Sequence, residues 1–423
     1  MTPPPVDCVA TPYLNMEVEV RTHKTNERRV INMKKRLWIT AAILTVAVAA
    51  ATVAYGPPVL LLGKTLNAFK EENLAHSFQT MHDIQPSVKI PKGGEGISFA
   101  YNEQPLIKSF QFKGNQLQAE EFLDETKTSG LLVVHNDTIA YENYYLGADE
   151  STRFAANSVT KSFISALIGI AVEEGDIHSV EDSVADYVSE FRGTDMEKIT
   201  VKDALHMATG IDFDEEKDMG TISIKSMFGT NKMKAIAKFG LAHEPGTNRT
   251  YSSINTDILG EVLINATGNS LSEYMGDKIW SKLGVEYDAY WSKNGKKELA
   301  NGGLHVALRD FARFGQLYLH NGKQGDTQLI PEEWVNDSVA TDAPYLLAPH
   351  NGESDSDLGY GYQWWIPEGN VGEFTAIGVF GQWIYVNPQK NVVIVKTSAH
   401  SGFEENDTEQ KTVEFFRAIA DSL

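Results

Sequence analysis

Strand-forming segments lie toward both ends of this 423-residue chain, and helical segments fill its middle. The β-rich runs Leu131–Val134 and Ile139–Tyr145 flank turn residues, which predicts a hairpin. Helical patterns dominate from about residue 180 to 300. Further strands are expected at residues 361–366, 374–379, 382–386 and 392–397, before a last helix at 408–421. Because strands and helices come in separate runs, we expect an α+β fold: both chain ends share an antiparallel sheet, and the middle packs on it as a helical lobe.

Composition and charge exclude several classes of protein. Apolar residues make up 42% of the chain, enough for a sizeable core. The formal net charge of −20 argues against a nucleic-acid partner, which requires a basic face. Cys8 is the one cysteine, so disulfides and a cysteine-based zinc site are excluded. Phosphate-cradling, dinucleotide and zinc-protease motifs are absent, and we expect no metal and no cofactor.

An uncharged run from Leu37 to Tyr55 follows three basic residues, Lys34 to Arg36. Its length suits a transmembrane anchor with the following chain outside the cytoplasm. A cleaved signal peptide beginning near Met33 is the alternative. Either reading predicts an exported protein, periplasmic or extracellular, which contacts the membrane through this segment if it is not cleaved.

The rest of the chain is divided by composition. Residues 1–32 are polar and are expected to be disordered or to result from a mis-called start codon, and residues 33–58 form the signal or anchor. Residues 59–95 are expected to be a partly helical connector that ends in a Pro-Lys-Gly-Gly sequence. We therefore expect the globular domain to span residues 96–423.

A Ser-x-x-Lys motif, Ser158-Val159-Thr160-Lys161, begins a helix that is apolar nearly all round to Val172. Such a helix must be buried. Residues three apart share a helix face, so Lys161 lies beside Ser158, and burial favours the neutral amine that can accept a proton. The helix start offers free N–H groups to an oxyanion. The alternative is a serine cap and a lysine that reaches solvent.

A second candidate element is Tyr251-Ser252-Ser253, which follows a Pro-Gly turn and precedes a helix at residues 255–267. A phenol near a lysine can act as general base and acid. Ser253 could hydrogen-bond Lys161 or substrate. An ordinary half-buried tyrosine is the alternative.

These two elements, in this order and spacing, resemble the class C β-lactamase and penicillin-binding-protein superfamily. The segments 199–210 and 302–315 resemble the sequences that link its motifs, and the resemblance covers roughly residues 96–423. It implies a β-lactamase/transpeptidase-like fold and a hydrolase that forms an acyl-enzyme on Ser158, activated by Lys161 and Tyr251.

Within that superfamily the sequence most resembles 6-aminohexanoate-dimer hydrolases and related carboxylesterases. β-Lactamases carry Lys-Thr-Gly on the strand beside the serine, whereas this chain reads Ala376-Ile377-Gly378. A β-lactam carboxylate would lack its cationic partner there. By resemblance, the N–H groups of Val379 and Ser158 form the oxyanion hole, and Gly378 allows close backbone approach. An ordinary glycine-containing hairpin is the alternative. Ser253 stands where many relatives have asparagine, which puts substrate preference in doubt.

Other residues were weighed as parts of the site. Asn301 and His305 flank a Gly-Gly turn and could line the cleft, although a structural histidine is the alternative for His305. The acidic run 214–218 is expected to be a solvated loop. Four aromatic side chains are expected in the core of the sheet: Trp364, Trp365, Trp383 and Tyr385.

The sequence therefore predicts an exported serine hydrolase that acts on a small-molecule ester or amide. A D-amino-acid peptidase or β-lactamase is the alternative with the same chemistry. A membrane-tethered sensor or binding domain of the penicillin-binding type, which acylates slowly, is the alternative of another class. A Ser-His-Asp hydrolase that uses His305 or His400 lacks a nucleophile elbow in this sequence.

Overall fold

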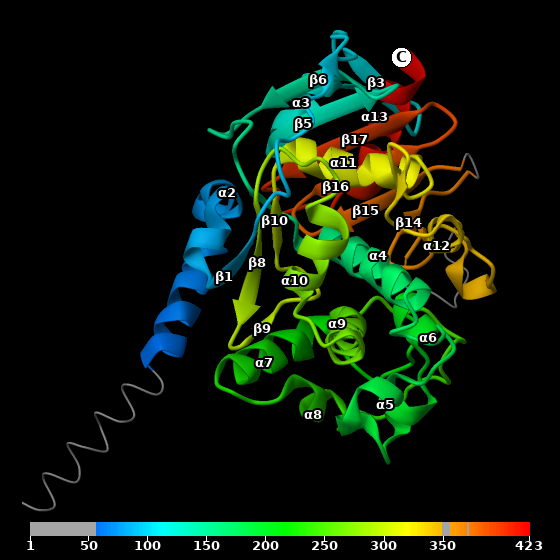
Figure 1. The fold of residues 1–423 in the computed structure, drawn as a ribbon. Coiled ribbons are helices and arrows are strands. Elements are labelled where there is room, and N and C mark those ends of the chain that lie inside the picture. Colours follow the sequence, from blue (N-terminus) through cyan, green and yellow to red (C-terminus); the bar gives the residue numbers. More distant parts are fainter. Residues whose placement is uncertain (1–55, 349–355, 370–371) are drawn as a thin grey trace, which may run out of the picture. The chain divides into compact units, whose positions relative to one another are not determined.

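The computed structural model describes residues 56–348, 356–369 and 372–423 (Figure 1). The chain divides into two compact units, Met1–Leu61 and Leu62–Leu423, and the second contains all the elements below. The expected anchor or signal at residues 37–55 lies outside the described residues. Within those ranges, no helix combines the length and apolar character needed to cross a bilayer.

The main sheet has eight strands and is built from both halves of the chain. Its order is β13 (Gly359–Tyr360), β14 (Trp365–Ile366), β15 (Phe374–Gly378), β16 (Gln382–Asn387), β17 (Val392–Ser398), β5 (Thr128–His135), β6 (Thr138–Tyr144) and β2 (Ala100–Tyr101). Only β2 and β6 pair in parallel. The early and late strands meet where β17 pairs with β5, which confirms the predicted α+β arrangement.

Most of the predicted strands are observed, and one is wrong. The β5–β6 hairpin turns through Asn136 and Asp137, both at positive φ (48° and 62°), as a tight hairpin turn requires. The strand expected over residues 361–366 is instead interrupted. Gln363 takes φ 62° and the Gly361 N–H donates to the Trp364 carbonyl, so β13 and β14 are two short strands joined by a turn.

Alternation along β5 sends its side chains into two separate cores. Leu131 and Val133 pack with α3 (Ala119–Glu125) and α13 (Thr408–Ser422) on one face. Leu132 and Val134 belong to the larger core, which includes α11 (Leu308–Leu319) and α4 (Thr160–Glu173). The sheet is therefore covered by helices on both faces (Figure 1).

The helical lobe comes from the middle of the chain, as predicted, and α4 runs through it. Its other helices are α5 (Val184–Tyr187), α6 (Val201–Leu205), α7 (Glu215–Met227), α8 (Lys232–Ile236), α9 (Ser253–Thr267) and α10 (Leu271–Met275). From Thr160 to Ala171 every residue of α4 is buried. The all-round apolar pattern was therefore a correct sign of a buried helix.

A second, smaller sheet was not predicted. It has the order β1 (Ser87–Ile90), β8 (Ala289–Asn294), β10 (Leu304–Val306) and β7 (Phe154–Ala155), with β9 (Lys297–Glu298) paired to β8. These strands are too short to show clear alternation in the sequence. Together with α2 (Leu74–Ile84), β1 lies in the segment expected to be a connector, and both elements belong to the compact unit Leu62–Leu423.

The remaining elements lie around this frame. They are the hairpins β3–β4 (Ser109–Phe112 and Asn115–Gln118) and β11–β12 (Lys323–Gln324 and Thr327–Gln328), the helix α12 (Glu332–Ser338), and single helical turns that include η2 (Asn157–Val159). The turn η2 connects β7 to α4 and therefore places Ser158 between the small sheet and the buried helix.

Candidate active site

Ser158 lies in a tight turn that is tied to the main sheet. The preceding residue, Asn157, takes φ 46°, a left-handed conformation that asparagine tolerates better than most residues. Its side-chain amide donates to the carbonyl of Val379, just past the end of β15, at 3.0 Å. The serine turn and the end of β15 are thereby held together.

Lys161 is buried, with 2% of its surface exposed, one helical turn after Ser158. Its Nζ donates to Ser158 Oγ at 2.7 Å and to the Asn301 carbonyl at 2.8 Å. The Asn301 side chain in turn donates to Asp257 of α9 at 3.1 Å, and Asp257 pairs with Lys232 at 2.8 Å. The predicted serine–lysine contact is present, and Asn301 contributes to the site through its backbone.

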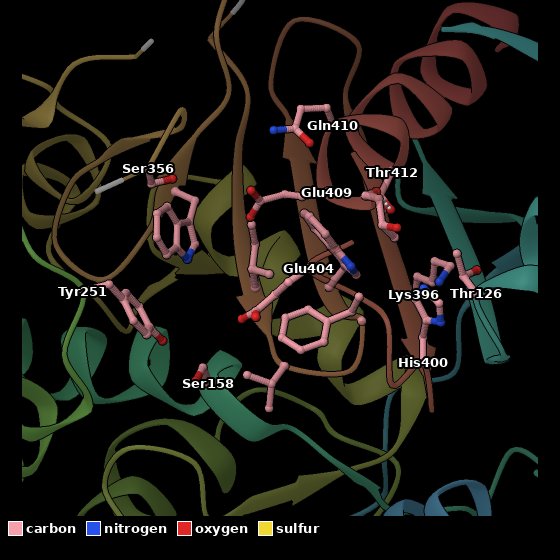
Figure 2. A pocket seen from close by; sticks show the side chains of 17 residues that line it. Thr126, Ser158, Tyr251, Ser356, Lys396, His400, Glu404, Glu409, Gln410 and Thr412 are labelled. Carbon is pink, nitrogen blue, oxygen red and sulfur yellow. Dashed lines mark hydrogen bonds between the residues drawn. The ribbon is translucent and has the colours of Figure 1, made fainter. Parts of the chain in front are cut away.

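Tyr251 lies against the same amine. The Lys161 Nζ is 5.2 Å from the centre of the Tyr251 ring, and the phenol oxygen points toward Ser158 (Figure 2). The ring stacks on Trp365 at 5.3 Å. Trp365 is covered in turn by the buried Arg249 guanidinium, which donates to the Leu358 carbonyl at 2.7 Å. These contacts fix the position of the tyrosine.

Gly378 makes the close approach of β15 to the serine turn possible. A Cβ at this position would lie 2.6 Å from the Ala156 carbonyl oxygen, closer than a side chain tolerates, and 3.2 Å from the Ser158 nitrogen, which is also tight. The next residue, Val379, is 38% exposed and lines the same cavity as Ser158. The backbone of residues 378 and 379 is thus adjacent to that of the serine.

Two other predicted site residues are placed differently. Ser253 begins α9, where its backbone N–H donates to Glu215 at 2.9 Å, while the Lys161 amine is directed to other acceptors. His305 is buried in β10, with its Nε2 2.7 Å from the Ser292 hydroxyl. Burial lowers the pKa of His305 to about 3. It lies outside the lining of the cavity, in agreement with the structural alternative.

A cavity of about 300 Å³ opens beside Ser158 and extends well beyond it (Figure 2). Its walls include Trp365 and Trp383, which were expected only in the core of the sheet, whereas Trp364 and Tyr385 are fully buried. The lining also includes groups that were not singled out as site residues: Thr126, Lys396, Phe403, Glu404, Glu409 and Thr412. The sequence signal for the basic part of this region was Lys396, which directly follows the apolar run Val392–Val395.

The acidic run at residues 214–218 is not a loop. Asp214 caps the start of α7 by accepting from the Lys217 backbone N–H, and the next acidic residues form the first turn of that helix. Carboxylates stabilise the positive end of a helix, which accounts for the cluster without a metal. No group of three or more candidate ligand side chains for a metal occurs in the part of the chain that the structure describes.

Comparison with known proteins identifies the family to which this chain belongs. The β-lactamase family model matches residues 118–418, and the chain belongs to that family. Among curated proteins, it is 28% identical over 309 residues to 6-aminohexanoate-dimer hydrolase from Paenarthrobacter ureafaciens, covering 70% of this chain and 79% of the relative. It is therefore a β-lactamase-family hydrolase related to 6-aminohexanoate-dimer hydrolase.

Solved structures agree with this assignment. A provisionally named 6-aminohexanoate-dimer hydrolase from Bacillus anthracis superposes with a TM-score of 0.75 at 27% identity, covering 84% of this chain and 95% of that one. A class C β-lactamase in complex with cefoxitin gives a TM-score of 0.55 at 17% identity, covering 72% and 96% of the two chains. At that identity the β-lactamase likeness establishes the fold alone.

Proposed function

We propose that this protein is a serine hydrolase that cleaves a small ester or amide through an acyl-enzyme on Ser158. The observation that carries the proposal is the 2.7 Å contact between Ser158 Oγ and the buried Lys161 amine, with the Tyr251 ring over that amine. A nucleophile beside a desolvated base that is itself held in place is the arrangement that activates a hydroxyl group.

In the proposed reaction, Ser158 Oγ attacks the carbonyl carbon while Lys161, aided by Tyr251, accepts the hydroxyl proton. The carbonyl electron pair moves to oxygen, and the backbone N–H groups of Ser158 and Val379 receive that oxyanion. When the intermediate collapses, the bond to the leaving oxygen or nitrogen breaks and the leaving group takes the proton. Water then attacks the acyl-enzyme by the same route, which releases the acid and restores the serine.

The relatives favour a linear amide or ester as the substrate. The Paenarthrobacter relative is named as a hydrolase of 6-aminohexanoate dimers, and we extend that class of small amides to this chain. A D-amino-acid peptidase or β-lactamase is the second candidate. Against it, Ala376 and Ile377 precede Gly378, so this strand offers no cation to a β-lactam carboxylate at the usual position.

A panel of p-nitrophenyl esters, aminohexanoate oligomers, D-peptides and nitrocefin tests these alternatives. We expect hydrolysis of esters or short linear amides by the wild type, little or none of nitrocefin, and loss of turnover in Ser158→Ala. Nitrocefin as the best substrate would reverse the order of the two candidates. A burst of one equivalent without turnover would instead support a slow-acylating sensor domain.

We further propose that the hydrolase acts outside the cytoplasm. The uncharged run at residues 37–55 behind a basic cluster supports this proposal. Fractionation of cells that express the full chain would test it, and activity found only in the cytoplasmic fraction would refute it.

A further inference from the structure

Lys396 is a buried amine that has no carboxylate partner among the residues that the structure describes. Lys396 lies in β17 with 1% of its surface exposed. Within the described part of the chain, the one hydrogen bond of its side-chain amine goes to the Ser398 hydroxyl at 2.5 Å. Burial lowers the pKa of Lys396 to about 7. Burying an unpaired ammonium costs stability, so this lysine needs an explanation other than the fold.

The side chain of Lys396 faces the same cavity as Ser158. Strand register puts Ile377, Trp383 and Lys396 in one row across β15, β16 and β17, and all three line the cavity. Gly381, in the turn between β15 and β16, keeps the space beside the amine open. A Cβ there would lie 3.9 Å from the Lys396 Nζ and 3.3 Å from the Ser398 hydroxyl.

His400 completes the basic end of the cavity. Its side chain lies next to Lys396, across the cavity from Tyr251 (Figure 2). Burial, together with the neighbouring Lys396 amine, lowers the pKa of His400. Its backbone N–H donates to the Phe380 carbonyl at 3.1 Å, which ties this end of the cavity to the turn that carries Val379.

The surface between the two ends suits an aliphatic chain. Trp365, Ile377 and Trp383 form apolar walls between Tyr251 and the basic end. Glu404 and Glu409 also line the cavity, on the side nearer Tyr251 (Figure 2). Burial, with the nearby Asp357 and Glu404, raises the pKa of Glu409 to about 7, which reduces its negative charge near neutral pH.

We propose that the far end of this cavity is an anion subsite in which Lys396, assisted by His400, receives a carboxylate carried by the substrate. The enzyme would then prefer linear esters or amides that bear a free carboxylate some carbons away from the scissile carbonyl. A bound carboxylate would give the buried amine an oppositely charged partner and favour its charged form. This inference rests on the proposed function, because it assumes that the carbonyl reacts at Ser158.

Matched substrate pairs test the subsite. For the acyl side the pair is p-nitrophenyl hexanoate and the mono-p-nitrophenyl ester of adipic acid; for the leaving group it is phenyl hexanoate and 4-carboxyphenyl hexanoate. In at least one pair the wild type should prefer the acidic member in kcat/KM. Lys396→Met should reduce that preference about tenfold or more, mainly through KM, as expected for a lost charge-assisted hydrogen bond. Lys390→Met, at an exposed lysine, is the matched control.

A second measurement does not depend on any variant. Adipate should inhibit hydrolysis of the neutral ester by the wild type competitively and about tenfold or more strongly than adipamide, its uncharged analogue. Hydrolysis of neutral esters without preference for either acidic substrate, or with a preference that Lys396→Met leaves intact, would overturn the subsite, as would equal inhibition by adipate and adipamide. If folded wild type hydrolysed none of the four esters, the proposed function itself would fail.

Discussion

At the scale of single residues, the site combines one contact that is local in the sequence with two that join distant segments. Ser158 and Lys161 meet because residues three apart share one face of a helix, and that relationship can be deduced from four letters of sequence. The contact of Lys161 with Asn301, 140 positions away in the chain, cannot be deduced in this way. Tyr251 was placed beside Lys161 only through resemblance to a family, because no local pattern links a loop to a helix about ninety residues earlier.

Removal of the Lys161 amine should abolish most of the hydrolytic activity without unfolding the protein. Lys161→Met keeps the apolar stem in the core and removes the proposed base, so we expect kcat/KM for a p-nitrophenyl ester to fall by about 10²–10⁴-fold. Circular dichroism and thermal unfolding provide the check on folding. Activity within threefold of the wild type would show that Lys161 is not the base.

Gly378→Ala should impair catalysis by pushing β15 away from the serine turn. The new Cβ would meet the Ala156 carbonyl at 2.6 Å, and displacement of the Val379 N–H should lower kcat by about 10²-fold or more, comparable to the loss of one oxyanion donor. Gly220→Ala in α7 is the matched control, because nothing lies within 4 Å of its added methyl group. Equal kcat values for the two variants would contradict the assignment of the Val379 N–H as an oxyanion donor.

At the scale of elements, long or strongly patterned segments were predicted well and short strands were not. The β5–β6 hairpin and α4 carry their own local signals, alternation with a turn in one case and an all-round apolar surface in the other. Strands β1, β8 and β10 have at most six residues each and are strands only because they pair with one another. The same limit applies to the cavity, whose lining joins α13 to four strands of the main sheet, β14 to β17.

The helix α2, in the segment expected to be a connector, packs against the turn beside Ser158. Its Phe78 packs edge-on against Phe380 at 5.0 Å, and Phe380 follows Val379 in the turn beside Ser158. Phe78→Leu should therefore lower kcat at least threefold as the turn loosens, with a stability loss below about 1.5 kcal/mol.

Phe110→Leu is the control for that experiment. Phe110 is equally buried, 3% exposed like Phe78, but its ring packs against Phe122 of α3 and Phe415 of α13, and none of these three rings lines the cavity. Steady-state kinetics and chemical unfolding of both variants separate the loss of kcat from the loss of stability. If they lose kcat in equal proportion to stability, α2 has no particular connection to the active site.

At the scale of the whole molecule, buried histidines make the fold sensitive to acid. The pKa of His305 is lowered to about 3 in the folded protein, against an ordinary value of 6.5 when unfolded. Between these values the unfolded chain binds more protons, so this residue lowers the free energy of unfolding as pH falls from about 6.5 toward 3. Asp310, whose pKa burial raises to about 7, acts in the opposite direction.

His305→Gln isolates the histidine contribution, because a glutamine amide can donate to or accept from the Ser292 hydroxyl but does not titrate. Thermal unfolding from pH 7 to pH 4 should show a smaller loss of Tm in the variant than in the wild type. His178→Gln, at an exposed position, should follow the wild type. Identical pH profiles for His305→Gln and the wild type would show that acid sensitivity arises elsewhere.

The central claim is that Ser158 is the nucleophile. Its most direct test is reaction of the purified protein with a fluorophosphonate probe, followed by proteolysis and mass spectrometry of the labelled peptide. We predict one probe per chain, attached to Ser158, with labelling abolished in Ser158→Ala and strongly slowed in Lys161→Met. A label on any other residue, or undiminished labelling of Ser158→Ala, would contradict the account.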